Sequence, residues 1–400
     1  MWQNLKNIYH LAQAFLSALY FGFPSKKLIV IGITGTDGKT TTVNMLHHIL
    51  TSCSKKVSSI SSINAVIGDK TFNTGFHVTT PNPWQVQKYL KQAVDSGSDY
   101  FILEATSHGL DQNRLAFVDF QAAALTNISH EHLDYHKNKE NYLASKAKLF
   151  KNVKYSILNA DDQNYKDLKE KISGKVLTYS LKKNTDFNIK KFPIKLRIAG
   201  DFNQENALAA LAVAITLRLN KHKVLRTLAT FTGISGRLES INLGQNFDVY
   251  IDFAHTPNAL EQVLKTLRSA TNDQQSTKLI AVFGAAGKRD KSKRPEMGKV
   301  AANFSDISIL TAEDPRGENV SNICEQIAEG FKKSGKKKDK DFFIIPDRKE
   351  AIKFAIDMAA ENDVVGLFGK GHEKSMNVGN KEIPWSDAII ARWAINRKIK

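Results

Sequence analysis

A short segment near the N-terminus constrains the fold more than any other part of the chain. The apolar run Leu28–Ile31 is followed by a glycine-rich stretch and then by a helical pattern that continues to Leu50. The stretch reads Gly35-Thr36-Asp37-Gly38-Lys39-Thr40-Thr41. A strand, a glycine loop and a helix in this order are the context that a phosphate-binding loop requires. We therefore expect an α/β fold with a nucleotide site at this loop.

The residue types of the loop suit a nucleoside triphosphate. Its backbone amides and the positive end of the following helix would hold phosphates. Lys39 would neutralise the β- and γ-phosphates, and the Thr40 hydroxyl would hold Mg²⁺. The match is imperfect, because the first glycine of the motif would fall on Ile33, and Gly32 stands one place earlier. A glycine-rich turn without a ligand remains the alternative.

The rest of the chain alternates strand and helix patterns, which predicts two α/β regions with largely parallel sheets. Expected strands in the first region are 100–104, 122–126 and 155–159. In the second region they are 248–252, 278–283, 307–311, 342–345 and 363–368. A chain of 400 residues suits more than one domain. We expect an N-terminal amphipathic helix and linker at 1–27, a central phosphate-loop ATPase domain at 28–237 and a C-terminal Rossmann-like domain at 238–400.

The N-terminal helix has an apolar stripe. Leu5, Ile8, Ala12, Phe15 and Leu19 recur at helical spacing, with mostly polar residues on the other side. The stripe could pack on its own domain, or it could lie on a membrane surface. No apolar stretch is long enough to span a bilayer, and no cleavable signal layout is present.

Composition narrows the partners and the compartment. The formal net charge is +17, which is compatible with nucleic acid, membrane surface or anionic substrates. Part of the excess lies in a lysine run at 332–340 that reads as a solvated segment. No basic and aromatic motif for nucleic acid is present, so we expect no nucleic-acid partner. Cys53 and Cys324 form no CxxC pair, which fits a reducing cytoplasm and gives no zinc ribbon.

Two further segments carry polar residues just after expected strands. Glu104 ends an apolar strand, and the carboxyl end of a parallel strand is where open α/β sheets bind ligands. Its carboxylate could bind Mg²⁺, which prefers hard oxygen ligands. The segment 127–136 holds three histidines whose spacing matches no zinc pattern.

Taken together, these motifs resemble the signature of the Mur ligases in order and spacing. The resemblance covers residues 28–376 and is nearest to the UDP-N-acetylmuramoyl-tripeptide synthetases (MurE type). Further matching motifs are Asn159-Ala160-Asp161-Asp162, Gly236-Arg237-Leu238-Glu239, Asp252-Phe253-Ala254-His255-Thr256-Pro257 and Gly369-Lys370-Gly371-His372-Glu373. One departure is at the N-terminus, where full-length members carry a uridine-nucleotide-binding domain before the phosphate loop. The substrate would then be held differently or carried by another group, such as a lipid.

The resemblance implies a mechanism and its catalytic residues. The carboxylate of a cell-wall peptide attacks the γ-phosphate of ATP, and an incoming amino acid displaces phosphate from the acyl phosphate. Thr40 and Glu104 would hold one Mg²⁺, and His132 would help to hold a second. Lys146 matches the family lysine that reacts with CO₂ to form a carbamate, which would be a ligand of the second metal. Lys39 completes the expected catalytic set.

The resemblance also implies binding residues. For ATP they are Asn203, Asn206, Arg237 and Asp252, together with the loop. For the muramoyl-peptide they are Thr79, Thr80, Thr106, Gln112 and Arg114. For the free amino acid they are Arg289, Asp314, Arg316, Gly369 and Glu373. Glu313-Asp314-Pro315-Arg316 differs from the Asp-Asn-Pro-Arg of members that add diaminopimelate, so meso-diaminopimelate and lysine both remain open.

Alternatives to this function remain. The first is another ligase of the superfamily, such as a folylpolyglutamate or poly-γ-glutamate synthetase. A scaffold with a relic ATP site and a nucleic-acid-binding ATPase are the others. We expect a cytoplasmic monomer that uses ATP and two Mg²⁺ ions, with peripheral membrane contact as an open option.

Overall fold

The structure is a computed structural model that describes residues 2–72, 80–129, 133–172, 174–270, 277–379 and 381–399. Two expected site residues, Thr79 and His132, lie outside the described residues. Contacts divide the chain into two compact units, Met1–Thr232 and Gly233–Lys400. Each unit is an α/β fold with a largely parallel sheet, which confirms the predicted fold class. The predicted domain limits at 27/28 and 237/238 stay predictions.

The first unit is built on a sheet with the order β4-β3-β2-β5-β1-β6-β7-β8-β9. At one edge the pairs β2–β3 and β3–β4 are antiparallel. All other neighbouring strands are parallel. The strands are β1 (Ile29–Thr34), β2 (Val57–Ile60), β3 (Ala65–Ile67), β4 (Lys70–Phe72), β5 (Tyr100–Glu104), β6 (Phe120–Leu125), β7 (Tyr155–Asn159), β8 (Lys175–Ser180) and β9 (Phe187–Asn188).

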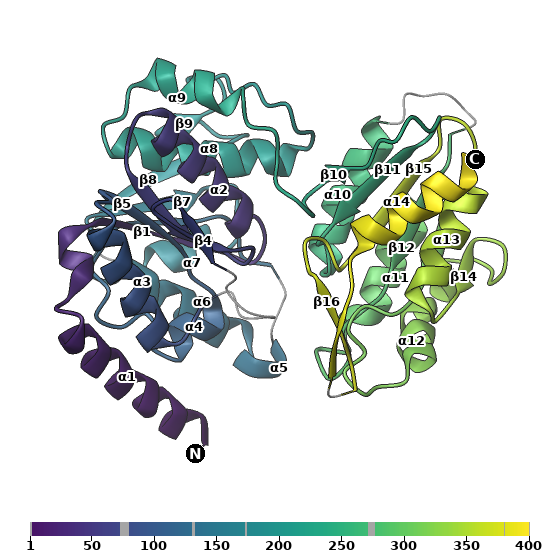
Figure 1. Cartoon of the computed structure of the whole chain (residues 1–400), viewed down its shortest axis with the longest axis horizontal. Coiled ribbons are helices and arrows are strands. Elements are labelled where there is room, and N and C mark those ends of the chain that lie inside the picture. Colours follow the sequence, from purple (N-terminus) through teal and green to yellow (C-terminus); the bar gives the residue numbers. More distant parts are fainter. Residues whose placement is uncertain are drawn as a thin grey trace. The chain divides into compact units, whose positions relative to one another are not determined.

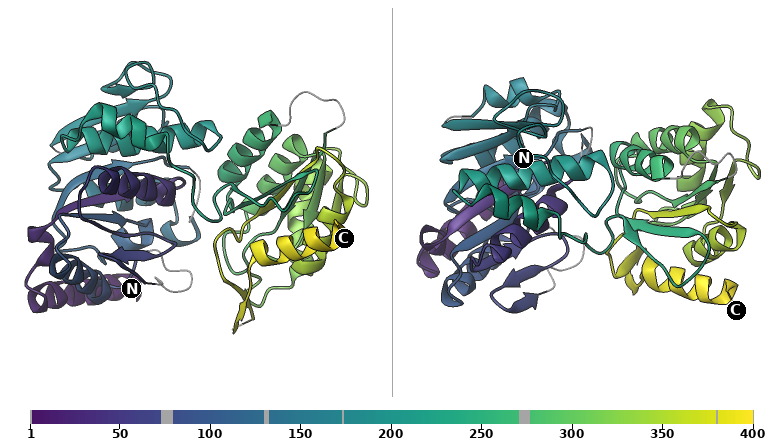
Figure 2. Two further views of the ribbon diagram at one scale, coloured as in Figure 1. Left: turned by 45° about the horizontal axis from the view of Figure 1, so that its top comes forward. Right: turned by 90° about the horizontal axis from the view of Figure 1, so that it is seen from above.

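Helices cover both faces of this sheet (Figures 1 and 2). On one face, α2 (Lys39–Ser52), α8 (Asp201–Thr216) and α9 (Lys221–Leu228) pack together. On the other face, α3 (Pro83–Asp95) packs against α1 (Trp2–Tyr20), and α4 (Ser107–Asp111) packs against α6 (Lys139–Ala147). The shorter elements are η1 (Pro24–Lys27), α5 (Leu133–His136), η2 (Lys148–Phe150) and α7 (Tyr165–Lys169). Apolar residues of β1, β5 and β6 form the buried centre of the unit.

The second unit has the strand order β10-β11-β15-β12-β13-β14, with only β10 antiparallel. Its strands are β10 (Glu239–Ser240), β11 (Asp248–Asp252), β12 (Leu279–Phe283), β13 (Ile307–Leu310), β14 (Phe342–Ile344) and β15 (Val364–Phe368). A separate ribbon pairs β16 (Ser375–Val378) with β17 (Lys381–Pro384). The helices are α10 (Pro257–Ala270), α11 (Lys293–Phe304), α12 (Val320–Lys333), α13 (Arg348–Met358) and α14 (Asp387–Lys398).

The N-terminal helix forms as predicted and packs on its own domain against α3. Its large apolar side chains are not on the side that packs, because Ile8, Leu16 and Leu19 are exposed. The buried side is made of the small residues Ala14, Ser17 and Ala18. A helix can approach its neighbour closely where its side chains are small, and this approach turns the large apolar side chains outward. Among the described residues, no helix combines the length and the apolar character needed to cross a bilayer.

Candidate active site

The glycine loop lies at the carboxyl end of the central strand of the first unit. Strand β1 pairs with β5 on one side and β6 on the other, with Ile33 opposite Glu104. Gly38 has a φ of 81° and precedes the first turn of α2. A Cβ atom there would lie 2.1 Å from Asn206 Oδ1, and one on Gly35 would lie 1.8 Å from Thr126 Oγ1. Both positions therefore need glycine, and at these two positions the loop presents backbone alone.

The end of the neighbouring strand β6 fixes the shape of the loop. The Asp37 amide donates to Asn127 Oδ1 at 2.9 Å, and the Thr126 hydroxyl donates to the Asp37 carbonyl oxygen at 2.6 Å. The Thr36 amide donates to the Asn127 carbonyl oxygen at 2.8 Å. These contacts hold the loop in place from a strand that lies about 90 residues along the chain. A loop fixed in this way is preorganised for an anion.

Lys39 reaches back across the loop from the first turn of α2. Its ammonium donates to the Thr36 carbonyl oxygen at 2.7 Å. This places a positive charge beside the backbone amides, where the β- and γ-phosphates of a nucleotide would lie. Thr41 is buried in the same turn, so it contributes to the packing of α2 rather than an exposed hydroxyl.

A buried oxygen cluster lies beside the loop. The Thr40 hydroxyl lies 3.1 and 3.0 Å from the two carboxylate oxygens of Glu104, and both residues are buried. Ser62 completes the cluster, because its hydroxyl lies 2.7 Å from Thr40 Oγ1 and its amide donates to Glu104 Oε2 at 2.9 Å. Hydroxyl and carboxylate oxygens beside a phosphate loop are the ligands that Mg²⁺ prefers. These residues fit a magnesium ion, which would supply charge to neutralise the phosphates of a nucleotide.

Lys146 joins the loop from helix α6. Its side chain is buried, and its Nζ donates to the Gly35 carbonyl oxygen at 2.7 Å. The same Nζ lies 4.5 Å from the centre of the Tyr142 ring, and the Tyr142 hydroxyl lies 2.9 Å from Thr36 Oγ1. The lysine that was singled out by resemblance therefore ends at the phosphate loop, 111 residues away in sequence.

The described residues expected to bind the peptide acceptor form one hydrogen-bonded group. The Thr80 hydroxyl donates to the Glu104 carbonyl oxygen at 3.1 Å and lies 3.0 Å from Thr106 Oγ1. Arg114 donates from Nη1 to the Thr80 carbonyl oxygen at 2.8 Å. It also donates from Nε and Nη2 to Gln112 Oε1, at 3.0 and 2.7 Å. This group adjoins the end of β5, directly after the Glu104 carboxylate.

Two of the residues expected to bind ATP lie on α8. Asn206 borders the loop at Gly38, and its Oδ1 accepts a bond from the Thr42 hydroxyl at 3.4 Å. Asn203 is buried, and its Nδ2 donates to the Ala199 carbonyl oxygen at 2.6 Å. Asn206 is thus beside the loop, whereas Asn203 lies one turn earlier on the same helix.

In the second unit, Arg237 and Asp252 lie at the carboxyl end of β11. Asp252 accepts the amides of Leu238 and Ala254 at 2.8 and 2.7 Å. Burial raises its pKa, and the nearby charge of Arg237 opposes that shift. The Arg237 guanidinium lies over the Phe253 ring, 4.5 Å from its centre. The two expected nucleotide contacts of this unit are therefore close neighbours.

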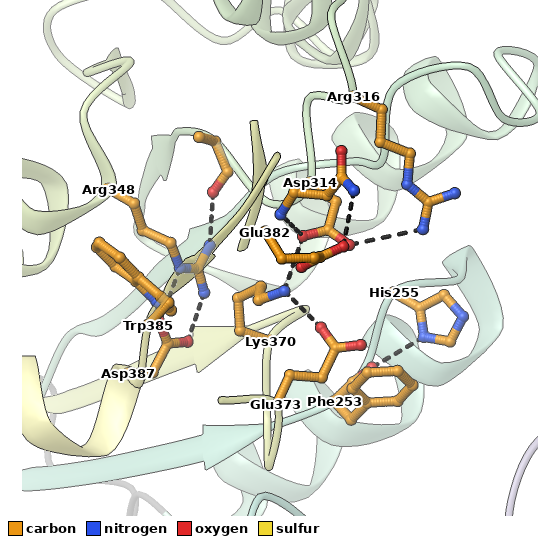
Figure 3. Close-up of polar contacts among 12 residues, drawn as sticks. Phe253, His255, Asp314, Arg316, Arg348, Lys370, Glu373, Glu382, Trp385 and Asp387 are labelled. Carbon is orange, nitrogen blue, oxygen red and sulfur yellow. Dashed lines mark hydrogen bonds and ion pairs between the residues drawn. The ribbon is translucent and has the colours of Figure 1, made fainter. Parts of the chain in front are cut away.

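Three residues expected to bind the amino acid meet around a buried lysine (Figure 3). Lys370 Nζ donates to Asp314 Oδ1 at 2.8 Å and also to Glu373 Oε2. Asp314 Oδ2 lies 3.6 Å from Arg316 Nη2. Burial alone lowers the pKa of Lys370, but the carboxylates of Glu373 and Asp314 raise it above its ordinary value. Lys370 is therefore a fixed cation that organises both carboxylates.

Two further expected residues border this cluster. Gly369 has a φ of 104°, and a Cβ there would lie 3.1 Å from Glu313 Cγ. Arg289 is exposed on the loop after β12. Gly287, two residues before Arg289, donates its amide to the Asp314 carbonyl oxygen at 2.8 Å, so the two loops are in contact.

A buried ion pair supports the loops that carry the cluster (Figure 3). Arg348 donates from Nε and Nη2 to the Asp387 carboxylate at 2.8 and 2.6 Å. It also donates to the carbonyl oxygens of Ala312 and Phe368, at 3.0 and 2.9 Å. These carbonyls come just before Glu313-Asp314 and Gly369-Lys370, so the pair ties the two loops together.

Sequence reasoning missed three members of these groups. Ser62 follows the four-residue strand β2 and belongs to no motif, so no signal in the sequence marks it. Tyr142 stands four residues before Lys146, a spacing that places both on one face of a helix. Lys370 belongs to the motif Gly369-Lys370-Gly371-His372-Glu373, but its two acidic partners can be assigned only from the fold.

Comparisons with known proteins find matches in both units. The family model "Mur ligase middle domain" matches residues 33–214, and "Mur ligase, glutamate ligase domain" matches residues 236–371. A protein of Caldanaerobacter subterraneus subsp. tengcongensis, named UDP-N-acetylmuramoyl-L-alanyl-D-glutamate--2,6-diaminopimelate ligase, is 38% identical. The match covers 95% of this chain and 81% of that protein.

Solved structures show the same fold. A structure of a UDP-N-acetylmuramoyl-L-alanyl-D-glutamate--2,6-diaminopimelate ligase is 31% identical, with a TM-score of 0.62 over 93% of this chain and 79% of its own. A folylpolyglutamate synthase of Mycobacterium tuberculosis has a TM-score of 0.69 at 16% identity, covering 91% of this chain and 96% of its own. At that identity the second likeness concerns the fold alone.

Proposed function

The chain belongs to the Mur ligase family, and from this premise we propose that it joins a diamino acid to a muramoyl-peptide with the consumption of ATP. The reaction class is that of an ADP-forming acid–amino-acid ligase in peptidoglycan synthesis. The observation that carries the proposal is the cluster of Thr40 and Glu104 beside the loop that follows β1, together with Lys39 and Lys146, which each donate to a backbone carbonyl oxygen of that loop. A folylpolyglutamate-type ligase shares only the fold at low identity and is the weaker alternative.

The chemistry has two steps. The peptide carboxylate attacks the γ-phosphate of ATP, which gives an acyl phosphate and ADP. The amine of the incoming amino acid then attacks the acyl carbon, inorganic phosphate leaves, and the ammonium proton goes to solvent or a base. Lys39 and the loop amides hold the charge that develops on the phosphate oxygens, and the fixed acceptor group at Thr80 and Arg114 orients the peptide.

Magnesium would be held by Thr40 and Glu104, with Ser62 beside them. When bound, it supplies charge that neutralises the phosphates in the transition state. His132 remains our candidate for a second magnesium site on the strength of the family resemblance alone.

We assign Lys146 to a carbamate in the working enzyme. Its amine would lose a proton and add to CO₂, which turns a cation into a carboxylate. Its buried position against Gly35 supports this assignment, because a carboxylate there could serve a metal at the same loop where a bare ammonium would repel it.

The amino acid would bind at the cluster around Lys370. Arg316 is partly exposed, and its 3.6 Å distance from Asp314 is longer than a hydrogen bond, so its guanidinium can turn to a carboxylate. Glu373 and Asp314 carry two negative charges against the single positive charge of Lys370, so the pair could also hold a distal ammonium. A substrate with both groups at its far end is meso-diaminopimelate, which we place before lysine. The enzyme would act as a cytoplasmic monomer.

The test is a phosphate-release assay over a matrix of acceptors and amino acids. We expect release to require both a muramoyl-dipeptide and a diamino acid. Lys39→Ala should reduce it to background while circular dichroism stays unchanged, because the variant removes charge at the γ-phosphate. Release that needs folate and glutamate instead would replace this function with the alternative, and normal turnover in folded Lys39→Ala would contradict the mechanism.

A further inference from the structure

The N-terminal helix α1 presents its large apolar side chains to solvent. Ile8, Tyr9, Phe15, Leu16, Leu19 and Tyr20 are exposed and form what we call the outer face. The opposite side packs with Ala14, Ser17 and Ala18, and all three are fully buried. A helix that packs only on its own domain has the reverse arrangement, with large apolar residues inside. The outer face is therefore built for a second contact.

Two aromatic side chains from elsewhere extend the outer face. Trp84, at the start of α3, lies 5.1 Å from Tyr20 between ring centres and is itself exposed. Phe117 is exposed and lies 5.4 Å from Phe15. Its φ of 62° is a costly conformation for a bulky residue, so the fold holds this ring outward at the expense of backbone strain. Figure 1 shows α1 at the outside of the first unit beside α3.

The charges carried by α1 and η1 themselves are all positive, and they point to an anionic partner. Residues 2–27 contain Lys6, Lys26 and Lys27 and no aspartate or glutamate. Lys6 lies near one end of α1, and the two other lysines lie in η1 just beyond its other end, with all three exposed. Positive charge at both ends of an apolar helix is complementary to a layer of acidic headgroups over hydrocarbon.

The width of the outer face favours a lipid surface over a single partner helix as the second contact. Its residues come in adjacent pairs, Ile8–Tyr9, Phe15–Leu16 and Leu19–Tyr20, so it covers about half of the helix circumference. A single partner helix contacts a narrower stripe, whose residues are spaced three and four apart in sequence. Tyrosine and tryptophan are the residues that favour the boundary between headgroups and acyl chains.

From these observations we infer that α1 is an interfacial membrane anchor, which lies flat on an anionic lipid surface through its outer face. The inference is independent of the ligase reaction. It concerns a surface that the candidate active site does not use.

Vesicle flotation tests the anchor directly. The full chain should float with vesicles of phosphatidylcholine and phosphatidylglycerol in equal parts, and much less with phosphatidylcholine alone. Ile8→Gln with Leu16→Gln should lower the partition coefficient by about tenfold or more, because two apolar side chains leave the interface while helix propensity is kept. Lys26→Gln with Lys27→Gln should lower it roughly tenfold at low salt and less at high salt.

The matched control is Ile389→Gln in α14, an isoleucine as exposed as Ile8, at 68% against 63%. It should float like the unchanged chain. Failure of the unchanged chain to float on acidic vesicles at low salt would overturn the inference. So would sedimentation velocity without lipid that shows a dimer abolished by Ile8→Gln with Leu16→Gln, because the outer face would then belong to a second copy.

Discussion

At the scale of single residues, Lys146 carries the most specific chemical assignment. Lys146→Ala should be nearly inactive, because it removes the carbamate that we assign to the loop. Added acetate should restore part of the phosphate release by placing a carboxylate in the vacated space. Lys139→Ala, an exposed lysine on the same helix, should stay near normal with or without acetate. Full activity of Lys146→Ala without acetate would remove the assignment.

Glu205 on α8 gives a pH-dependent prediction that is independent of catalysis. Burial, followed by the negative charge of Asp161, raises its pKa to about 7 from the ordinary 4.5. Below pH 4.5 the Glu205 carboxyl is protonated in both the folded and the unfolded chain. Between the two values only the unfolded state ionises, so the free energy of unfolding falls as pH rises, and the loss is complete above 7.

Glu205→Gln imitates the protonated carboxyl and should remove this loss. Since Glu205 is only partly buried, we expect a gain of about 1–3 kcal/mol at pH 8 and almost none at pH 4.5. Urea unfolding of both proteins at the two pH values checks this. An equal difference at both values would show that Glu205 ionises normally in the folded chain.

At the scale of elements, two ion pairs join helices α13 and α14, and they differ in how deeply they are buried. Arg348–Asp387 is buried, and Arg397–Asp357 has side chains that are 43% and 40% exposed. Asp387→Ala should destabilise the second unit by about 3–5 kcal/mol, because it leaves a buried guanidinium without its carboxylate. Asp357→Ala should cost less than about 1 kcal/mol. Denaturation midpoints measure both, and similar losses would contradict the role given to Arg348.

The sequence predicts helices and strands better than it predicts the contacts that they make. The strand before the glycine loop and the helix after it were predictable, because an apolar run followed by helical periodicity is a local signal. Helix α1 was predictable for the same reason, but periodicity groups residues on one face without saying whether that face turns inward. The β16–β17 ribbon was missed, since each of its strands has only four residues, too few for the alternation in Ser375–Val378 to stand out.

In the candidate site, too, single residues were predictable from the sequence, whereas contacts between distant segments were not. Glu104 and Thr40 were predictable from strand ends and loop chemistry. The meeting of Lys370 with Asp314 joins residues 56 apart in sequence, and only the sheet brings the ends of β13 and β15 to one edge. No local pattern contains that information.

At the scale of the whole molecule, amino-acid choice should follow the cluster around Lys370. Steady-state kinetics should favour meso-diaminopimelate over lysine. Arg316→Ala should lower the ratio of kcat/KM for meso-diaminopimelate to kcat/KM for lysine by about 10- to 100-fold. That is the effect expected from losing one hydrogen-bonded charge pair. Arg392→Ala, an exposed arginine of the same unit, should leave the ratio unchanged. A preference for lysine in the unchanged enzyme would show that Asp314 and Glu373 dominate over Arg316.

The central claim is that the chain activates a carboxylate as an acyl phosphate, and oxygen transfer tests it most directly. A muramoyl-dipeptide labelled with ¹⁸O in its terminal carboxylate is turned over with ATP, Mg²⁺ and meso-diaminopimelate, and the released phosphate is analysed by mass spectrometry. We predict that each phosphate formed with product carries one labelled oxygen from the carboxylate, and that Lys39→Ala yields no labelled phosphate. Phosphate whose added oxygen comes only from water, formed at the same rate without the peptide, would contradict the account.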